Sequence, residues 1–116
     1  MSSKNVLTGA KTFFPEVEFV PFEGKDSDNP FAFKYYNPEQ LISGKSMADH
    51  FRFAIAYWHS FCGNGADPFG MPTRNMPWLN ANNPMDRAKD KMDAAFEFIT
   101  KIQAPYFCFH DFDLIE

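Results

Sequence analysis

The sequence predicts an α/β fold built around one strand–helix–strand segment. Two short, almost entirely apolar runs, residues 51–58 and 105–109, have the length and composition of buried strands. Between them lie a long loop and a stretch over residues 83–103 with apolar residues at helical spacing. This order of elements is that of a βαβ unit, whose crossover we expect to be right-handed.

Length and composition limit what such a chain can be. Its 116 residues, 45% of them hydrophobic and 22% charged, allow at most one small globular domain. A net charge of −4 argues against a nucleic-acid partner, and no apolar run is long enough to span a membrane. The N-terminal residues lack a signal-peptide pattern. Two cysteines, Cys62 and Cys108, make no disulfide framework and favour a reducing, cytoplasmic compartment.

Phenylalanine is unusually frequent. The chain has 15 Phe beside 4 Tyr and 2 Trp, so that 18% of its residues are aromatic. Each large ring buries about 150–250 Å², whereas a chain this short buries only roughly 60–70% of its unfolded surface. We therefore expect some of the rings to lie at an interface, in a ligand pocket or against further chain.

Residues 1–50 are expected to form an N-terminal extension, and residues 51–116 the β-loop-α-β segment. The polar residues 1–11 predict a loose leader. Further on, the extended candidates Phe19–Phe22 and Phe31–Tyr36 flank a turn-rich stretch. These two stretches form either a small hairpin or an irregular arm.

Three helix starts can be read from capping residues. Asn37 followed by Pro38 predicts a short helix that ends before Gly44, and Ser46 offers a second cap. The strongest signal is Asn83 followed by Pro84, which predicts a helix that continues to about Gln103. Its apolar stripe, which we expect to face the core, consists of Met85, Ala88, Met92, Ala95, Phe96, Ile99 and Ile102.

The two strands bring polar residues to one edge. In a parallel pair, the carboxyl ends of both strands lie at the same side, where α/β enzymes place their sites. Trp58 and His59 follow the first strand, and residues 110–113, of sequence His-Asp-Phe-Asp, follow the second. The loop from Phe61 to Asn83 is long, and loops of this length are usually functional or mobile.

His110 is the candidate for proton transfer. A neighbouring carboxylate, from Asp111 or Asp113, can fix the tautomer of its ring and leave the other nitrogen for a substrate. The alternative is an ordinary polar turn at the end of a strand. A metal site is the weaker interpretation, because one His and two Asp within four residues make no complete cage.

Two aromatic residues have both a functional and a structural interpretation. Trp58 either stacks on a sugar ring or walls off water, or it packs in the core. Phe69, at the tip of a Gly-rich loop, either inserts into a partner subunit or folds back onto its own core. His50 and His59 have no obvious partner and are interpreted as structural or surface residues.

Several stretches of the chain resemble the xylose isomerase family, specifically the N-terminal part of its long type, which has an N-terminal extension. They agree with the family in order and spacing over nearly everything after residue 13. The stretches are residues 22–27 (FEGKDS), 33–37 (FKYYN), 52–61 (RFAIAYWHSF), 65–70 (GADPFG), 84–86 (PMD) and 105–113 (PYFCFHDFD).

The resemblance implies an aldose–ketose isomerase of xylose metabolism on a (β/α)8 TIM barrel. Such enzymes interconvert D-xylose and D-xylulose, usually also D-glucose and D-fructose, by a metal-assisted hydride shift. They use two divalent ions, typically Mg, Mn or Co, and form homotetramers in the cytoplasm. The family ligands lie on later strands, so the resemblance implies no metal ligand among these residues.

The resemblance also implies roles for four side chains. By it, His110 helps open the sugar ring and Asp113 orients His110. Trp58 walls the substrate site, and Phe69 reaches into the site of a neighbouring subunit.

A barrel needs roughly 250 residues, so we expect this chain to be an N-terminal fragment, a partial barrel that ends just beyond the second strand. Alone it should neither bind metal tightly nor isomerise sugar. The alternatives are an aromatic-rich carbohydrate-binding module, complete as it stands, or another enzyme of the same barrel superfamily. A complete module should unfold cooperatively, whereas a barrel fragment should be loose or aggregate.

Overall fold

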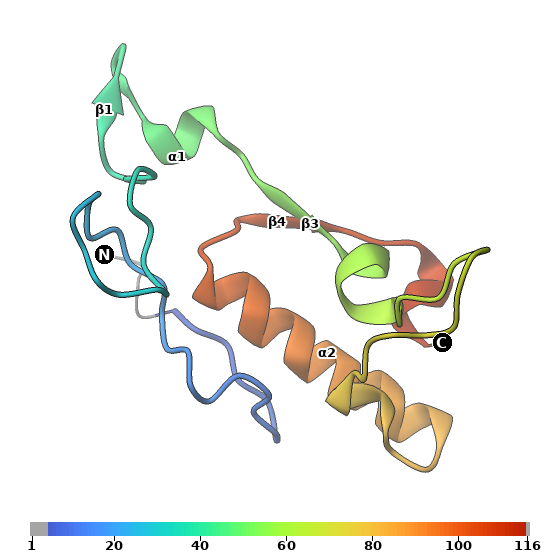
Figure 1. Ribbon diagram of the computed structural model, residues 1–116. Helices are drawn as coiled ribbons and strands as arrows, with labels where there is room; N and C mark the ends of the chain where they lie inside the picture. The colour runs from blue at the N-terminus through green and yellow to red at the C-terminus, as the bar shows by residue number, and fades with distance from the viewer. Residues whose placement is uncertain (1–4, 116) are drawn as a thin grey trace.

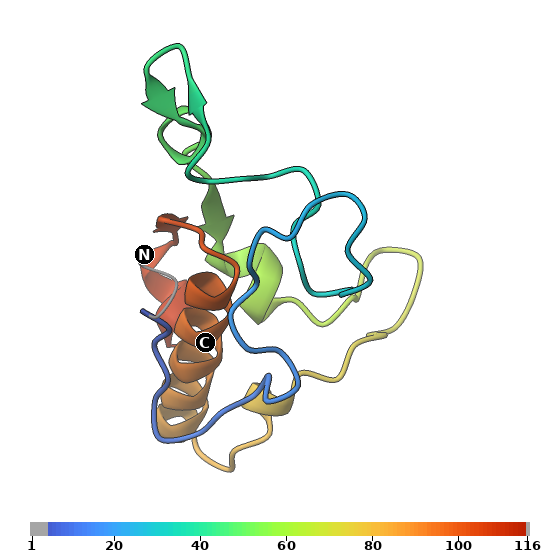
Figure 2. The ribbon, with the colours of Figure 1, turned by 90° about the vertical axis from the view of Figure 1, so that its left-hand side faces the viewer.

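The computed structural model describes residues 5–115 (Figure 1). Part of the expected leader, residues 1–4, lies outside the described residues. The main helix, α2, packs against a two-stranded parallel sheet, while the N-terminal segments lie beside them (Figures 1 and 2). In chain order the elements are β1 (Leu41–Ile42), β2 (Lys45–Ser46), α1 (Met47–His50), β3 (Ala54–Ala56), η2 (Trp58–Cys62), η3 (Pro77–Leu79), α2 (Pro84–Lys101), β4 (Tyr106–Cys108) and η4 (Asp111–Leu114).

The predicted parallel pairing of the two strands is confirmed. β3 and β4 pair in parallel, with Ala54 opposite Tyr106 and Ala56 opposite Cys108, and α2 lies between them in the chain. Both strands are shorter than predicted. The predicted burial of β4 on both faces is wrong, since all three of its residues are exposed. Within residues 5–115 the sheet has only these two strands, so its outer face and free edge stay open.

Helix α2 begins and ends at the predicted signals. The Asn83 side-chain oxygen accepts a hydrogen bond from Asp86 N at 2.8 Å, and Pro84 occupies the first turn, where no amide hydrogen is needed. At the other end, Ile102 caps the helix, and Gln103 takes a left-handed backbone conformation with φ 64°. The chain therefore turns out of the helix directly before β4.

The buried face of α2 differs from the predicted stripe. Met85 and Met92 are 62% and 48% exposed, so their assignment to the core is wrong. Ala95 and Ile99 are buried as predicted. The buried face also carries four charged residues that lie off the stripe: Asp90, Lys91, Glu97 and Lys101. The difference from the predicted stripe has a physical cause, since these polar groups find partners within the protein whereas thioethers tolerate water at modest cost.

An aromatic core lies under the inner face of α2. Tyr57 and Phe61 are almost fully buried and pack edge to face at 5.4 Å between ring centroids. Trp78 adds its ring and donates its indole N–H to the Phe61 carbonyl at 2.8 Å. The loop between Phe61 and Asn83 is thus pinned to the core in its second half, where η3 forms.

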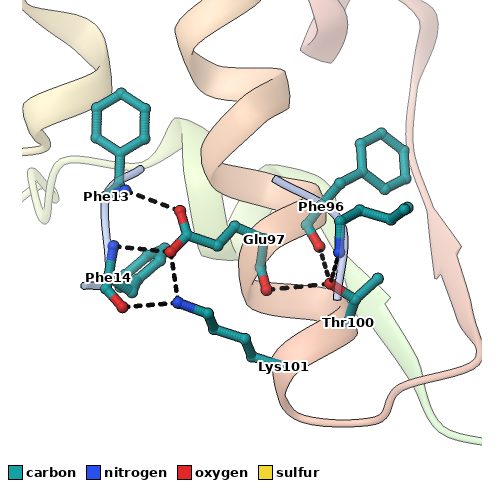
Figure 3. Close-up of polar contacts among 7 residues, drawn as sticks. Phe13, Phe14, Phe96, Glu97, Thr100 and Lys101 are labelled. Carbon is teal, nitrogen blue, oxygen red and sulfur yellow. Dashed lines mark hydrogen bonds and ion pairs between the residues drawn. The ribbon is translucent and has the colours of Figure 1, made fainter. Parts of the chain in front are cut away.

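The N-terminal segment over residues 5–20, which we call the arm, runs along α2 (Figure 2). Glu97 accepts hydrogen bonds from the amides of Phe13 and Phe14 at 2.8 and 3.1 Å. Lys101 donates to the Phe14 carbonyl at 2.8 Å and to Glu97 at 2.6 Å (Figure 3). Glu97 and Lys101 are therefore buried because they bind the backbone of the arm.

Residues 19–36, for which a hairpin or an irregular structure was predicted, form an irregular segment with an isolated parallel bridge between Phe22 and Phe33. The antiparallel pair of β1 and β2, with Leu41 opposite Ser46, follows this segment and was not predicted. The predicted helix at Asn37 is wrong. The Asn37 side chain accepts from Glu39 N at 3.2 Å and its carbonyl from Gln40 N at 3.1 Å, which closes a turn instead. The cap at Ser46 is confirmed, since its hydroxyl accepts from Asp49 N at 3.1 Å at the start of α1.

Both cysteines are free thiols.

As expected, many of the aromatic rings are only partly covered. The phenylalanines at least 37% exposed are Phe22, Phe31, Phe51, Phe53, Phe69, Phe107, Phe109 and Phe112. Eight of the 15 Phe therefore find no full cover within the described residues.

Candidate active site

The candidate site lies where β3 and β4 end. Each strand runs directly into a short helix, η2 after β3 and η4 after β4. Because the strands are parallel and in register, both helices lie at the same end of the sheet (Figure 1). The predicted common edge is therefore present, although each strand end folds into a helical turn rather than an open loop.

Trp58 and His110 meet at this edge. Their ring centroids are 4.6 Å apart with planes inclined by 46°, and Trp58 also contacts the His59 ring at 5.5 Å. Trp58 is only half-buried and stands apart from the buried core cluster, so its packing interpretation is not supported. The indole and the imidazole thus form one partly open aromatic surface.

The carboxylate partner of His110 is Asp113. One oxygen, Oδ2, accepts hydrogen bonds from His110 N at 2.7 Å and from His110 Nδ1 at 3.1 Å. The Asp113 side chain is 3% exposed, whereas that of His110 is 55% exposed. Because an ionised carboxylate only accepts, Nδ1 carries a hydrogen and Nε2 is left toward the solvent.

Asp111 has a different place. It is exposed, and its Oδ1 accepts from Phe112 N at 2.8 Å, a local turn contact within η4. The sequence left Asp111 and Asp113 open as partners of His110, and the geometry selects Asp113. Phe112 also stacks on the imidazole, with centroids 5.6 Å apart and planes inclined by 12°. The His110 ring therefore contacts both an indole and a phenyl ring.

Three residues next to the site were not predicted: the buried Tyr57 and Lys91 and the half-buried Cys62. The Cys62 thiol donates to the Asp113 carbonyl at 3.6 Å, and the Lys91 ammonium donates to the Cys62 sulfur, also at 3.6 Å. Tyr57 packs beside them, with Lys91 Nζ 6.0 Å from its ring centroid. Its hydroxyl is buried and has no hydrogen-bond partner within residues 5–115.

Burial controls the ionisation of this cluster. It raises the pKa of the Tyr57 hydroxyl to about 12, with the negative charges of Cys62 and Asp113 acting in the same direction. Burial also raises the pKa of the Cys62 thiol, against the opposing effect of Lys91. Both groups are therefore neutral near pH 7. Periodicity gave no signal for Lys91, because it lies off the apolar stripe of α2.

Phe69 lies away from any cover, 95% exposed. Its loop is closed by hydrogen bonds in both directions between Asp67 and Gly70, each 3.3 Å, and by Asp67 Oδ1 accepting from Phe69 N at 2.8 Å. The interpretation in which Phe69 folds back onto its own core is therefore wrong. Insertion into a partner subunit stays a prediction.

His50 and His59 lie on the surface. Both are exposed, and His50 Nε2 lies 2.7 Å from the Ile42 carbonyl. In the part of the chain that the structure describes, no group of three or more His, Cys, Asp or Glu side chains could hold a metal ion. Over the same residues, no helix has the length and apolarity to cross a membrane.

A strand–helix–strand unit with a histidine–carboxylate pair at the shared strand ends defines the class, an α/β protein segment. Comparison with curated proteins shows what the chain is similar to: over 97% of its length it is homologous to xylose isomerases. It is 60% identical over 112 residues to xylose isomerase 1 and 59% identical to xylose isomerase 2 of Xanthomonas campestris pv. campestris strain 8004. The xylose isomerase of Xanthomonas oryzae pv. oryzae strain MAFF 311018 is 58% identical.

The predicted resemblance is therefore confirmed. The chain spans about a quarter of the length of the curated relatives it matches, since the aligned residues cover 25% of each of these three. This coverage agrees with the expectation that the chain corresponds to part of such an enzyme. No protein-family model matches the chain.

Proposed function

We propose that the chain forms part of a xylose isomerase, an aldose–ketose isomerase that interconverts D-xylose and D-xylulose, and also D-glucose and D-fructose. One observation carries the proposal. Within a chain 60% identical to such enzymes, an indole, an imidazole and a buried carboxylate lie together at the carboxyl ends of two parallel strands. We further propose that β3, α2 and β4 form the first strand–helix–strand unit of a (β/α)8 barrel.

His110 is proposed to open the sugar ring. Ring opening moves a proton from the hydroxyl on C1 to the ring oxygen, and a histidine near neutral pH can take up or release a proton. Asp113 holds Nδ1–H at 3.1 Å, so that Nε2 is the nitrogen that exchanges the proton. Trp58, at 4.6 Å from the imidazole, covers one side of the ring and excludes water from it.

Phe69 is proposed to reach the site of a neighbouring subunit in a homotetramer. A fully exposed phenyl ring on a hydrogen-bonded loop is unfavourable in water and favours an apolar cover. The division into an extension over residues 1–50 and a barrel segment over residues 51–116 belongs to the same proposal. So does a cytoplasmic location, for which the two free thiols are the support.

The residues present do not fit a metal site, as no suitable group exists among residues 5–115. We propose that the two divalent ions, Mg, Mn or Co, are bound by residues in the part of the relatives' length that this chain does not span. The roles of His110, Asp113 and Trp58 are derived without them.

A chimeric enzyme tests the proposal. In it, this chain replaces the homologous quarter of xylose isomerase 1 of X. campestris, and the formation of xylulose from xylose is measured with added Mg²⁺. We expect activity within about ten-fold of the parent. His110→Asn should reduce kcat roughly 10²- to 10⁴-fold, the range of a lost general acid–base group.

Two controls accompany this experiment. His59→Asn changes an exposed histidine next to Trp58 and should leave kcat within about two-fold, since surface substitutions have small effects. The 116-residue chain alone should form no xylulose and bind no metal tightly. An inactive chimeric enzyme, or xylulose formation by the chain alone, would contradict the proposal.

A further inference from the structure

A buried cluster behind the His110–Asp113 pair has no part in the proposed reaction. It consists of Tyr57, Cys62 and Lys91, and both Tyr57 and Lys91 are fully buried. Removing an ammonium group from water is costly, and it persists in folded proteins where specific partners hold it. An aliphatic residue would fill the inner face of α2 at no such cost, so the position of Lys91 requires a reason.

Cys62 is the point where the two halves of the site are joined. It is the last residue of η2, whose first residue is Trp58. Its thiol reaches across to the backbone carbonyl of Asp113 in η4, at 3.6 Å. One side chain thus links the element that presents the indole to the element that presents the carboxylate.

Lys91 holds this link from a third element, α2. Its ammonium donates to the Cys62 sulfur at 3.6 Å and lies 6.0 Å from the Tyr57 ring centroid. The sulfur therefore accepts from Lys91 while its hydrogen is donated to Asp113. This arrangement requires the thiol rather than the thiolate, and burial favours the thiol.

Asp113 is then held from both sides. Its carbonyl accepts from Cys62, and its carboxylate accepts from the backbone and ring of His110. A shift of η4 against η2 moves the carboxylate, and the imidazole moves with it relative to Trp58. Displacements of about 1 Å in such groups cost up to about 10²-fold in rate.

We propose that Cys62 and Lys91 are positioning residues of this site: the link from Lys91 through Cys62 to Asp113 fixes η4 against η2 and so sets His110 against Trp58. This inference rests on the proposed function, because it assigns both side chains to the same reaction. It adds to that function a pair of side chains that act through Asp113.

A double-mutant cycle in the chimeric enzyme tests it. The variants are Cys62→Ala, Lys91→Met and Asp113→Asn, the two doubles that combine each of the first two with Asp113→Asn, and Lys91→Arg. Lys89→Met serves as the matched control, since Lys89 is an exposed lysine of the same helix. For each variant, kcat and KM for xylose and the thermal midpoint are measured.

Cys62→Ala and Lys91→Met should each lower kcat about ten-fold with KM within about two-fold, because the substrate's own contacts remain. In the Asp113→Asn background, the same changes should cost less than about two-fold, since they act through Asp113. Lys91→Arg, which keeps a buried cation and donor, should recover most of the loss. Lys89→Met should match the parent.

Additive effects in the cycle would overturn the inference, because a purely structural role lowers kcat by the same factor with or without Asp113. Unchanged kcat in both single variants would overturn it as well. Either result in an active chimeric enzyme leaves the proposed function standing. An inactive parent chimera contradicts the proposed function itself and the inference with it.

Discussion

Glu97 and Asp113 are two buried carboxylates that bind backbone amides, but they differ in the exposure of their side-chain partners. Glu97 is fully buried and uses both oxygens inside the protein, on Phe13, Phe14 and Lys101. Asp113 is equally covered, but one of its partners is an imidazole that is 55% exposed. Hydrogen bonding to a buried carboxylate thus holds the arm against α2 at Glu97, whereas at Asp113 it orients a partly exposed imidazole.

The comparison shows how burial of charge can be used. At Glu97, every partner is itself covered, so the cluster fastens the arm to α2 (Figure 3). At Asp113, one Oδ2 holds the backbone and the ring of His110 together, so the exposed end is fixed without being covered. Three predictions separate these two functions and a fourth concerns the exposed Phe69; they are given from the largest expected effect to the smallest.

Glu97→Ala should release the arm from α2. It leaves the Lys101 ammonium and two amides without their buried acceptor, and breaking such a pair costs about 3–5 kcal/mol. Amide hydrogen exchange at Phe13 and Phe14 in the chimeric enzyme should accelerate about 100-fold or more. Lys89→Ala, an exposed change on the same helix, should leave exchange unaltered. Equal protection in both variants would show that the arm is held by its aromatic contacts instead.

Asp113→Asn should slow the isomerisation of xylose in the chimeric enzyme and leave the arm bound to α2. An amide can donate to Nδ1 and so favour the tautomer with the hydrogen on Nε2, the wrong one for proton uptake. We expect kcat to fall roughly 10- to 100-fold, with amide exchange at Phe13 unchanged. An altered exchange rate in the arm would mean that the two carboxylates are coupled through α2.

The pH dependence of the arm provides a finer test. Burial by itself raises the pKa of the Glu97 carboxyl, but the hydrogen bonds from Lys101, Phe13 and Phe14 outweigh it, and the pKa lies below its usual value of 4.5. A lowered pKa in the folded state contributes stability above pH 4.5 that is lost as the pH falls through the folded pKa. The rate of amide hydrogen exchange at Phe14, corrected for the intrinsic pH dependence of exchange, should therefore rise only below about pH 4.5. Glu97→Gln should abolish that rise.

Phe69→Ala should have the smallest effect on the chain itself. A ring that is 95% exposed contributes little to its own fold, so the change should alter the unfolding free energy by less than about 0.5 kcal/mol. In the chimeric enzyme, the same variant should weaken subunit association or raise KM, as measured by sedimentation and steady-state kinetics. An effect on unfolding without either would contradict the proposed contact between subunits.

Local sequence signals predicted much of the frame. Asn83 caps the N-terminus of α2 and Pro84 occupies its first turn. The start of the helix could therefore be predicted from these two residues without knowledge of any tertiary contact. The parallel strands, and with them the meeting of Trp58 and His110, followed from the order of apolar runs and one rule of connection. These features depend on neighbours in the chain or on general geometry.

The parts that sequence reasoning missed depend on distant partners. Glu97 and Lys101 have the composition of a solvated helix face, and only the backbone of Phe13 and Phe14, more than 80 residues earlier, makes them interior. Lys91 is interior for the same kind of reason. At Asn37 two local signals competed, and the side chain's own turn prevailed over a helix cap.

The fastening of the arm also constrains the order of assembly during synthesis. Phe13 is separated by 84 residues from the carboxylate that binds its amide. At about 5–20 residues per second, a ribosome needs on the order of 4–17 s to make that interval. During this time the emerging segment carries exposed phenyl rings and no acceptor, which makes it a natural early client for a chaperone.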